Sequence, residues 1–120
     1  MSGEPKAALV TGASSGIGRA TAIALAKLGY DVAVNYSHNE AGARATADLV
    51  QAAGAKALVL QCDVSEDACV RAMLARVESE FGRLDALVNN AGATALTRIS
   101  GARLSASSLV KLTTAALLAA

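Results

Sequence analysis

The residues best suited to chemistry form a glycine-rich stretch near the start of the chain. Gly12, Gly16 and Gly18 follow a short apolar run, residues 7–11, and precede a helical pattern. In this position Gly12 permits a tight turn, Gly16 lets the backbone approach a pyrophosphate, and Gly18 lets the helix pack closely against the strand. We call this stretch the glycine loop. Its candidate ligand-binding residues are Gly12, Ser14, Ser15, Gly16, Ile17 and Gly18. A turn that binds nothing is the alternative, but the flanking strand and helix favour a dinucleotide pyrophosphate at the helix N-terminus.

Two more polar segments follow later apolar runs. They are Cys62, Asp63 and Val64, and then Asn89, Asn90, Ala91 and Gly92. With the pattern TGxxxGxG of the glycine loop, at these separations, they resemble the short-chain dehydrogenase/reductase family of NAD(P)-dependent oxidoreductases, which have a Rossmann fold. The resemblance extends over residues 6–92, and residues 34–41 look most like the 3-oxoacyl-carrier-protein reductase and glucose dehydrogenase branches.

The resemblance implies positions for both ends of a bound dinucleotide. Asp63 and Val64 would border the adenine ring, while the groove beside the ribose on the nicotinamide side would be lined by Asn90, Ala91 and Gly92. A carboxylate just past the carboxyl end of a strand can accept a hydrogen bond from the adenine amino group, and Val64 adds an apolar edge.

Two of the polar residues also have structural interpretations. Asp63 has the alternative of being a turn residue before Ser65, because aspartate carboxylates bind nearby backbone N–H groups. For Asn89 we expect the side chain to join neighbouring backbone segments and not to touch the ligand.

The choice between the two nicotinamide cofactors depends on the residues after the second predicted strand. An acidic residue there would bind the ribose 2′-hydroxyl and repel a 2′-phosphate, whereas Asn35, Tyr36 and Ser37 are neutral. We therefore expect Tyr36 and Ser37 to lie beside this ribose and NADP(H) to be preferred over NAD(H). The basic residue that many NADP-preferring relatives carry before the second motif glycine is absent, because Ser15 occupies that position.

The resemblance also implies a catalytic Tyr-x-x-x-Lys pair, in which the lysine lowers the pKa of the tyrosine. Neither Tyr30 nor Tyr36 has a lysine four residues later, so we assign no catalytic residue. The chain is then expected to be a cofactor-binding fragment of an oxidoreductase that lacks the catalytic half. The alternatives are a non-catalytic nucleotide-binding module, an interaction module that depends on a partner, and an unstable truncated product.

The elements that must position these residues alternate in type along the chain. Apolar runs predict strands over residues 7–11, 32–35, 57–61 and 84–89, and periodic patterns predict helices over 17–28, 41–53 and 65–81, the last capped by Ser65. This order predicts an α/β fold, a Rossmann-like parallel sheet with flanking helices, truncated at about four strands. The last strand would then be an uncovered edge through which the protein could self-associate.

A change in composition divides the chain near residue 92. Residues 1–92 form the predicted dinucleotide-binding unit, and residues 93–120 form a tail that contains no acidic residue. The tail has two interpretations: an aberrant, frame-shifted reading of the gene, or a genuine terminal helix that begins at Ser107 or Ser108.

Composition excludes several classes of function. The 120 residues carry 11 Lys and Arg against 10 Asp and Glu, so no net field attracts nucleic acid, and no apolar run is long enough to span a membrane. Cys62, Cys69 and the single His38 lack the clustering of a metal site, and we expect no metal. No secretion signal precedes the first strand, which predicts a cytoplasmic protein with reduced thiols.

Overall fold

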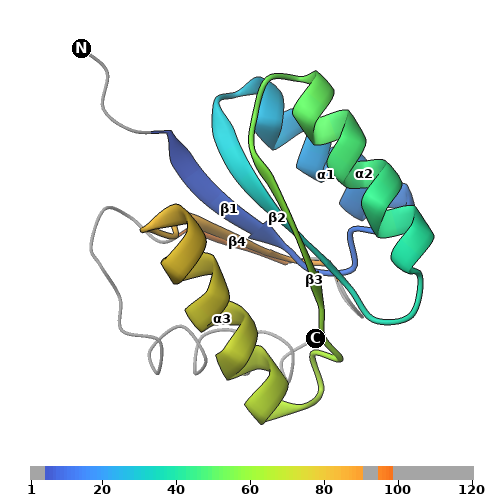
Figure 1. The fold of residues 1–120 in the computed structure, drawn as a ribbon, viewed down its shortest axis with the longest axis vertical. Coiled ribbons are helices and arrows are strands. Elements are labelled where there is room, and N and C mark those ends of the chain that lie inside the picture. Colours follow the sequence, from blue (N-terminus) through green and yellow to red (C-terminus); the bar gives the residue numbers. More distant parts are fainter. Residues whose placement is uncertain (1–4, 91–94, 99–120) are drawn as a thin grey trace.

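The structure, a computed structural model, describes residues 5–90 and 95–98. Strands and helices alternate along most of this length (Figure 1). The elements are β1 (Lys6–Val10), α1 (Gly16–Lys27), β2 (Tyr30–Tyr36), α2 (Glu40–Ala52), β3 (Ala57–Gln61), α3 (Asp67–Phe81), β4 (Ala86–Asn89) and β5 (Ala95–Arg98). Every strand and helix predicted within residues 7–89 is present, with ends that differ by a few residues.

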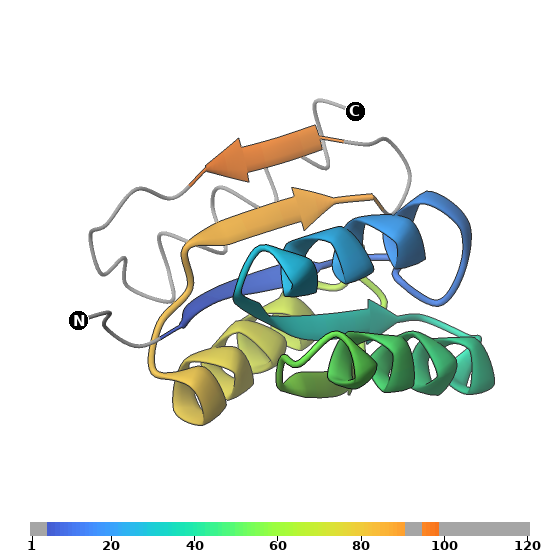
Figure 2. The same cartoon turned by 90° about the horizontal axis from the view of Figure 1, so that it is seen from above.

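The strands form one sheet in the order β3-β2-β1-β4-β5. Strands β1 to β4 are parallel, and β5 runs antiparallel to β4 (Figure 2). The predicted Rossmann-like α/β fold is confirmed.

Helices cover both faces of the sheet because the strands are apolar on both sides. Val10, Val34 and Val88 pack beneath α1 and α2, whereas Leu9 and Leu87, one position earlier on their strands, pack beneath α3. Successive side chains of a strand point to opposite faces, so α3 lies across the sheet from the other two helices (Figure 1). Among the described residues no helix is long and apolar enough to cross a bilayer.

The prediction that Ser65 caps α3 is wrong. The helix begins at Asp67, its N-cap residue is Glu66, and no side chain caps it. The Ser65 amide and hydroxyl instead donate to Oδ1 of Asp63, at 3.0 and 2.7 Å. The Asp63 carboxylate thus binds Ser65 in a tight turn. The end of α3 agrees with the prediction, since Gly82 terminates it in the left-handed conformation.

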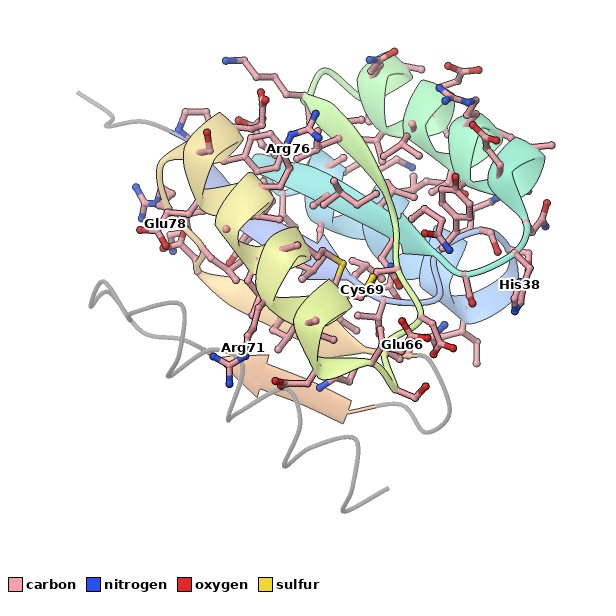
Figure 3. All side chains as sticks on the ribbon, turned by 60° about the horizontal axis from the view of Figure 1, so that its bottom comes forward. His38, Glu66, Cys69, Arg71, Arg76 and Glu78 are labelled. Atoms are coloured by element: carbon pink, nitrogen blue, oxygen red, sulfur yellow. The ribbon has the colours of Figure 1, made fainter. Side chains whose placement is uncertain are left out.

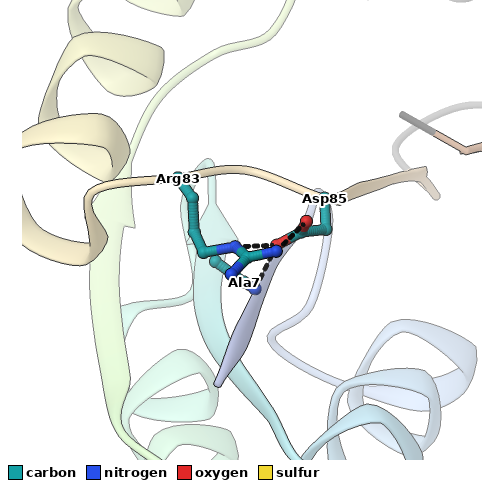
Figure 4. Close-up of polar contacts among 3 residues, drawn as sticks. All are labelled: Ala7, Arg83 and Asp85. Carbon is teal, nitrogen blue, oxygen red and sulfur yellow. Dashed lines mark hydrogen bonds and ion pairs between the residues drawn. The ribbon is translucent and has the colours of Figure 1, made fainter. Parts of the chain in front are cut away.

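The start of β4 is fixed by a half-buried carboxylate (Figure 4). Asp85 Oδ2 accepts from the Ala7 amide at 2.9 Å and from Nε of Arg83 at 2.7 Å, while the Asp85 amide donates to the Ala7 carbonyl at 2.8 Å. Burial raises the pKa of Asp85, but the hydrogen bonds from Arg83 and Ala7 and the positive charge of Arg83 outweigh it, so the pKa lies below its ordinary value. These bonds join β4 to β1.

The expectation that β4 forms an uncovered edge is also wrong. β5 pairs along all of β4, with Ala95 opposite Asn89 and Arg98 opposite Ala86. Part of the tail is therefore a strand, which neither interpretation of the tail predicted. The helix predicted from Ser107 or Ser108 lies outside the described residues.

Candidate functional site

The loops that follow β1, β2 and β3 meet at one edge of the sheet, because the carboxyl ends of parallel strands lie together. Between them is a cavity of about 310 Å³. Its lining residues are Gly12, Asn35, Ser37, Cys62, Asp63, Val64 and Ser65. Of the predicted cofactor-binding residues, Gly12, Ser37, Asp63 and Val64 are thus brought together at one cavity.

The glycine loop presents open backbone at the start of α1. Gly12 and Gly16 have φ angles of 61° and 58°, a region that side chains disfavour. A Cβ built on Gly16 would meet no atom within 4 Å, so the backbone here faces open space. Ser15 is the N-cap residue of α1, and its side chain makes no capping bond. The N–H groups of this first helical turn are therefore available to an anion.

Close packing leaves no room for a side chain at Gly18. A Cβ at this position would overlap the Gly12 carbonyl oxygen and would lie 2.8 Å from Nδ2 of Asn90 and 2.9 Å from Cα of Ala13. The helix approaches the glycine loop itself and the end of β4, which the motif alone does not reveal.

Asn35 supports the glycine loop from β2. Its Oδ1 accepts from the Gly12 amide at 3.1 Å, and its Nδ2 donates to the carbonyls of Leu60 and Cys62 at 3.3 and 3.2 Å. Its backbone carbonyl accepts from the Ala13 amide at 2.8 Å. From the sequence, Asn35 is predicted only as a neutral residue at the end of the second strand. Its place at the end of an apolar strand was the available signal, because most buried side-chain amides are hydrogen-bonded.

The end of β4 supports the loop from the other side. The Asn90 backbone amide donates to Oγ1 of Thr11, and its side-chain Nδ2 donates to the Gly12 carbonyl, each at 3.0 Å. Ala91 and Gly92, the other predicted residues of this segment, lie outside the described residues.

Asn89 does not have the predicted role. Its side chain is 1% exposed, and neither Oδ1 nor Nδ2 has a hydrogen-bond partner among the described residues. It joins no backbone segment that the structure describes, and its buried amide carries the cost of unmade hydrogen bonds.

Asp63 is the turn residue that the sequence allows, and it also lies at the cavity. It lines the cavity, and its Oδ1 also binds Ser65 in a turn. The hydrogen bonds from the Ser65 hydroxyl and amide, and the nearby charge of His38, lower the pKa of Asp63. The carboxylate is therefore ionised at neutral pH.

Three further side chains are placed outside the cavity. Tyr36 is half-buried and packs against the core beneath α1 and α2, because it follows Asn35 on the opposite face of β2. Ile17 is 66% exposed on the first turn of α1, and His38 is exposed on the loop between β2 and α2 (Figure 3).

The surroundings of Cys62 keep its thiol in the neutral form. Burial, together with the adjacent Cys69 thiol, raises the pKa of Cys62 to about 12, so the Cys62 thiol is protonated at neutral pH. Within residues 5–90 and 95–98 no three His, Cys, Asp or Glu side chains are grouped to hold a metal.

Comparison with known proteins agrees with this geometry. The model of the short chain dehydrogenase family matches residues 6–113. The chain is 49% identical over 89 residues to the 3-oxoacyl-acyl-carrier-protein reductase of Staphylococcus aureus, an alignment that covers 74% of this chain and 36% of the reductase.

Solved structures show the same similarity. Acetoin dehydrogenase from Enterobacter cloacae matches with a TM-score of 0.71 and 41% identity, over 77% of this chain and 36% of that one. A Burkholderia cenocepacia protein, described as a dehydrogenase and solved with bound NADP, matches with a TM-score of 0.68 and 32% identity, over 72% of this chain and 34% of that one. The chain thus spans about a third of the length of these relatives.

Proposed function

The chain belongs to the short chain dehydrogenase family of NAD(P)-dependent oxidoreductases, and from this premise we propose that it binds a nicotinamide dinucleotide at the carboxyl edge of the sheet. The observation that carries the proposal is the open backbone at Gly16, where the first turn of α1 faces space that a Cβ would enter. Oriented N–H groups at a helix N-terminus favour a pyrophosphate.

Each part of the dinucleotide has matching residues in the proposed site. Backbone N–H groups of the first turn of α1, with the hydroxyls of Ser14 and Ser15, would hold the pyrophosphate. Val64 would contact the adenine ring, and Asp63 would accept from its amino group through the carboxylate oxygen that Ser65 leaves free. Beyond the glycine loop, the proposed cofactor-binding residues are Ser37, Asp63, Val64, Asn90, Ala91 and Gly92. Tyr36, which the sequence also suggested, is left out because its side chain packs outside the cavity.

We propose that NADP(H) is preferred over NAD(H). Ser37 is neutral and lines the cavity at the end of β2, where an acidic side chain would repel a 2′-phosphate. The Burkholderia cenocepacia relative supports the proposal, because its structure contains NADP.

We further propose that this chain supplies the cofactor half of a carbonyl or alcohol oxidoreductase. The nicotinamide ring would supply the hydride, and the residues described above would bind and orient the dinucleotide. Transfer also needs a proton at the substrate oxygen, and none of the 120 residues forms a Tyr-x-x-x-Lys pair. We therefore expect no turnover by these residues alone.

Calorimetric titration of the purified chain with NADPH and then with NADH tests the proposal. We expect one saturable site that binds NADPH more tightly than NADH. Absence of binding heat, together with an unchanged melting temperature at millimolar concentrations of both cofactors, would reject the cofactor site. A chain that shows no cooperative melting at all would instead be the unstable product.

A second candidate, a module that depends on a partner chain, is favoured by the unpaired amide of Asn89. Because β4 is already paired with β1 and β5, the missing hydrogen bonds would have to come from a partner segment packed on the face of the sheet at Asn89. If the amide is unpaired in solution, Asn89→Leu should stabilise the isolated chain by about 1–3 kcal/mol, because a buried polar group without partners is costly. A loss of stability, with dissociation of a dimer seen by sedimentation, would show that self-association satisfies Asn89.

A further inference from the structure

Arg19 connects the glycine loop to α2, and the proposed function gives this side chain no task. Its Nη2 donates to the Ser14 carbonyl at 2.8 Å and to the Gly42 carbonyl at 3.0 Å, while its Nε donates to Oγ1 of Thr46 at 2.9 Å. One half-buried guanidinium thus binds acceptors on two segments that lie far apart in the sequence. The helices α1, which carries Arg19, and α2, which carries Gly42 and Thr46, lie side by side (Figure 1).

Thr46 completes the connection from the opposite side. It is fully buried on α2, and its hydroxyl lies 2.7 Å from the Ala13 carbonyl and 3.1 Å from the Gly42 carbonyl. A hydroxyl has one proton, so the shorter contact identifies Ala13 as its main acceptor. Arg19 and Thr46 therefore hold two successive carbonyls of the glycine loop.

The first turn of α2 lies directly against the glycine loop. A Cβ on Gly42 would overlap the Ser14 carbonyl and the side-chain amide of Asn39. Oδ1 of Asn39 caps the helix by accepting from the Gly42 amide at 2.9 Å. Asn39 belongs to the loop that also contains Ser37, which lines the cavity.

We propose that Arg19 is a positioning residue for the dinucleotide, holding the glycine loop and the first turn of α2 at a fixed separation. The inference rests on the proposed cofactor site. The pyrophosphate would bind the glycine loop and the 2′-substituent would bind near Ser37, so the separation decides whether one ligand reaches both. Loss of Arg19 should weaken NADPH more than NADH, since only NADPH has a 2′-phosphate.

The geometry requires an arginine rather than any cation. The guanidinium is planar and presents several N–H groups in fixed directions, so it can bind three acceptors at once. A lysine ammonium keeps the charge on a flexible stem and cannot reproduce this arrangement. Arg19→Lys therefore separates positioning from simple electrostatic attraction to phosphate.

The experiment compares Arg19→Lys and Arg19→Met with the wild-type chain by calorimetric titration of NADPH and NADH. Matched controls are Arg71→Lys and Arg71→Met, because Arg71 is exposed on α3 and its one ion pair within the described part of the chain is with Asp67 (Figure 3). Both Arg19 variants should bind NADPH at least about tenfold more weakly, as expected when charge-assisted hydrogen bonds are lost. The preference for NADPH over NADH should fall, and the controls should match wild type.

Hydrogen exchange supplies a readout that needs no cofactor. The Ala13 amide, which donates to the Asn35 carbonyl, should exchange faster in Arg19→Met while amides of the β1 core keep their protection. If the wild-type chain binds neither cofactor, the proposed function fails, and unchanged Ala13 exchange would reject the positioning role as well.

Two results would overturn the inference in a wild-type chain that binds. Wild-type affinity in Arg19→Lys would show that charge is sufficient. An equal loss of NADPH and NADH affinity would show that Arg19 does not couple the two subsites.

Discussion

Replacing Gly18 by alanine has two opposing effects on the free energy of unfolding, one from helix propensity and one from close packing. Gly18 is the third residue of α1, and its φ lies outside the left-handed region, so alanine can adopt its backbone conformation. Propensity alone favours alanine over glycine within a helix by about 0.5–1 kcal/mol. The structure predicts the opposite sign, because the new Cβ would overlap the Gly12 carbonyl and crowd Ala13 and Asn90.

The contacts at Gly18 determine the expected size of the effect. Two of the crowded atoms belong to the backbone, so no side-chain rotation relieves them, and overpacking costs about 1–3 kcal/mol. Displacing Nδ2 of Asn90 would break its hydrogen bond to Gly12, a loss of about 1 kcal/mol. After subtraction of the propensity gain, we expect Gly18→Ala to lower the free energy of unfolding by about 1–3 kcal/mol.

Urea unfolding measures this effect directly. The control is Ala24→Gly, an exposed position on the same helix, which should lose only the propensity difference of about 0.5–1 kcal/mol. A Gly18→Ala chain at least as stable as wild type, with the same dependence on urea, would refute the close approach of α1 to the glycine loop.

Three further predictions address the ligand and the sheet. Gly16→Val should abolish NADPH binding in a titration, because it places a β-branched side chain at a φ of 58° and in the open space where the pyrophosphate would lie against the glycine loop. Unchanged affinity would refute the site. Ser37→Asp should weaken NADPH more than NADH, because a carboxylate repels the 2′-phosphate; equal effects would place the ribose elsewhere. Asp85→Asn should cost about 1–3 kcal/mol at pH 7, because it weakens charge-assisted hydrogen bonds. The pKa of Asp85 is lowered in the folded state, so the contribution of Asp85 to the free energy of unfolding is present above pH 3.8 and is lost as pH falls through the folded-state pKa. A stability difference between wild type and Asp85→Asn that persists unchanged in acid would contradict this.

The sequence predicts those features that local chemistry decides. Apolar runs specify strands buried on both faces, and the spacing of Gly12, Gly16 and Gly18 indicates a turn that leads into a helix. The start of α3 is mispredicted because the Ser65 hydroxyl has two possible partners nearby, the first turn of the helix and the Asp63 carboxylate. The Ser65 hydroxyl is a plausible helix cap, but it binds the Asp63 carboxylate two residues earlier. β5 is missed because its pairing with β4 depends on contacts between strands and not on its own short sequence.

The contacts that shape the glycine loop come mainly from residues that its motif does not contain. Asn35 binds the Gly12 and Ala13 amides, Asn90 binds the Gly12 carbonyl, and Thr46 binds the Ala13 carbonyl. These partners come from β2, the end of β4 and α2, so the back of the loop is fixed by three separate parts of the fold.

A loop held in this way needs little reorganisation when an anion binds. Pre-organisation raises the affinity because the oriented N–H groups need not be ordered during binding. The glycines permit the loop conformation, whereas the distant polar side chains select it. A chain that keeps all three glycines but loses the side chains of Asn35 and Thr46 would still match the motif. Its affinity for a dinucleotide would nevertheless be lower, because the loop conformation would no longer be selected.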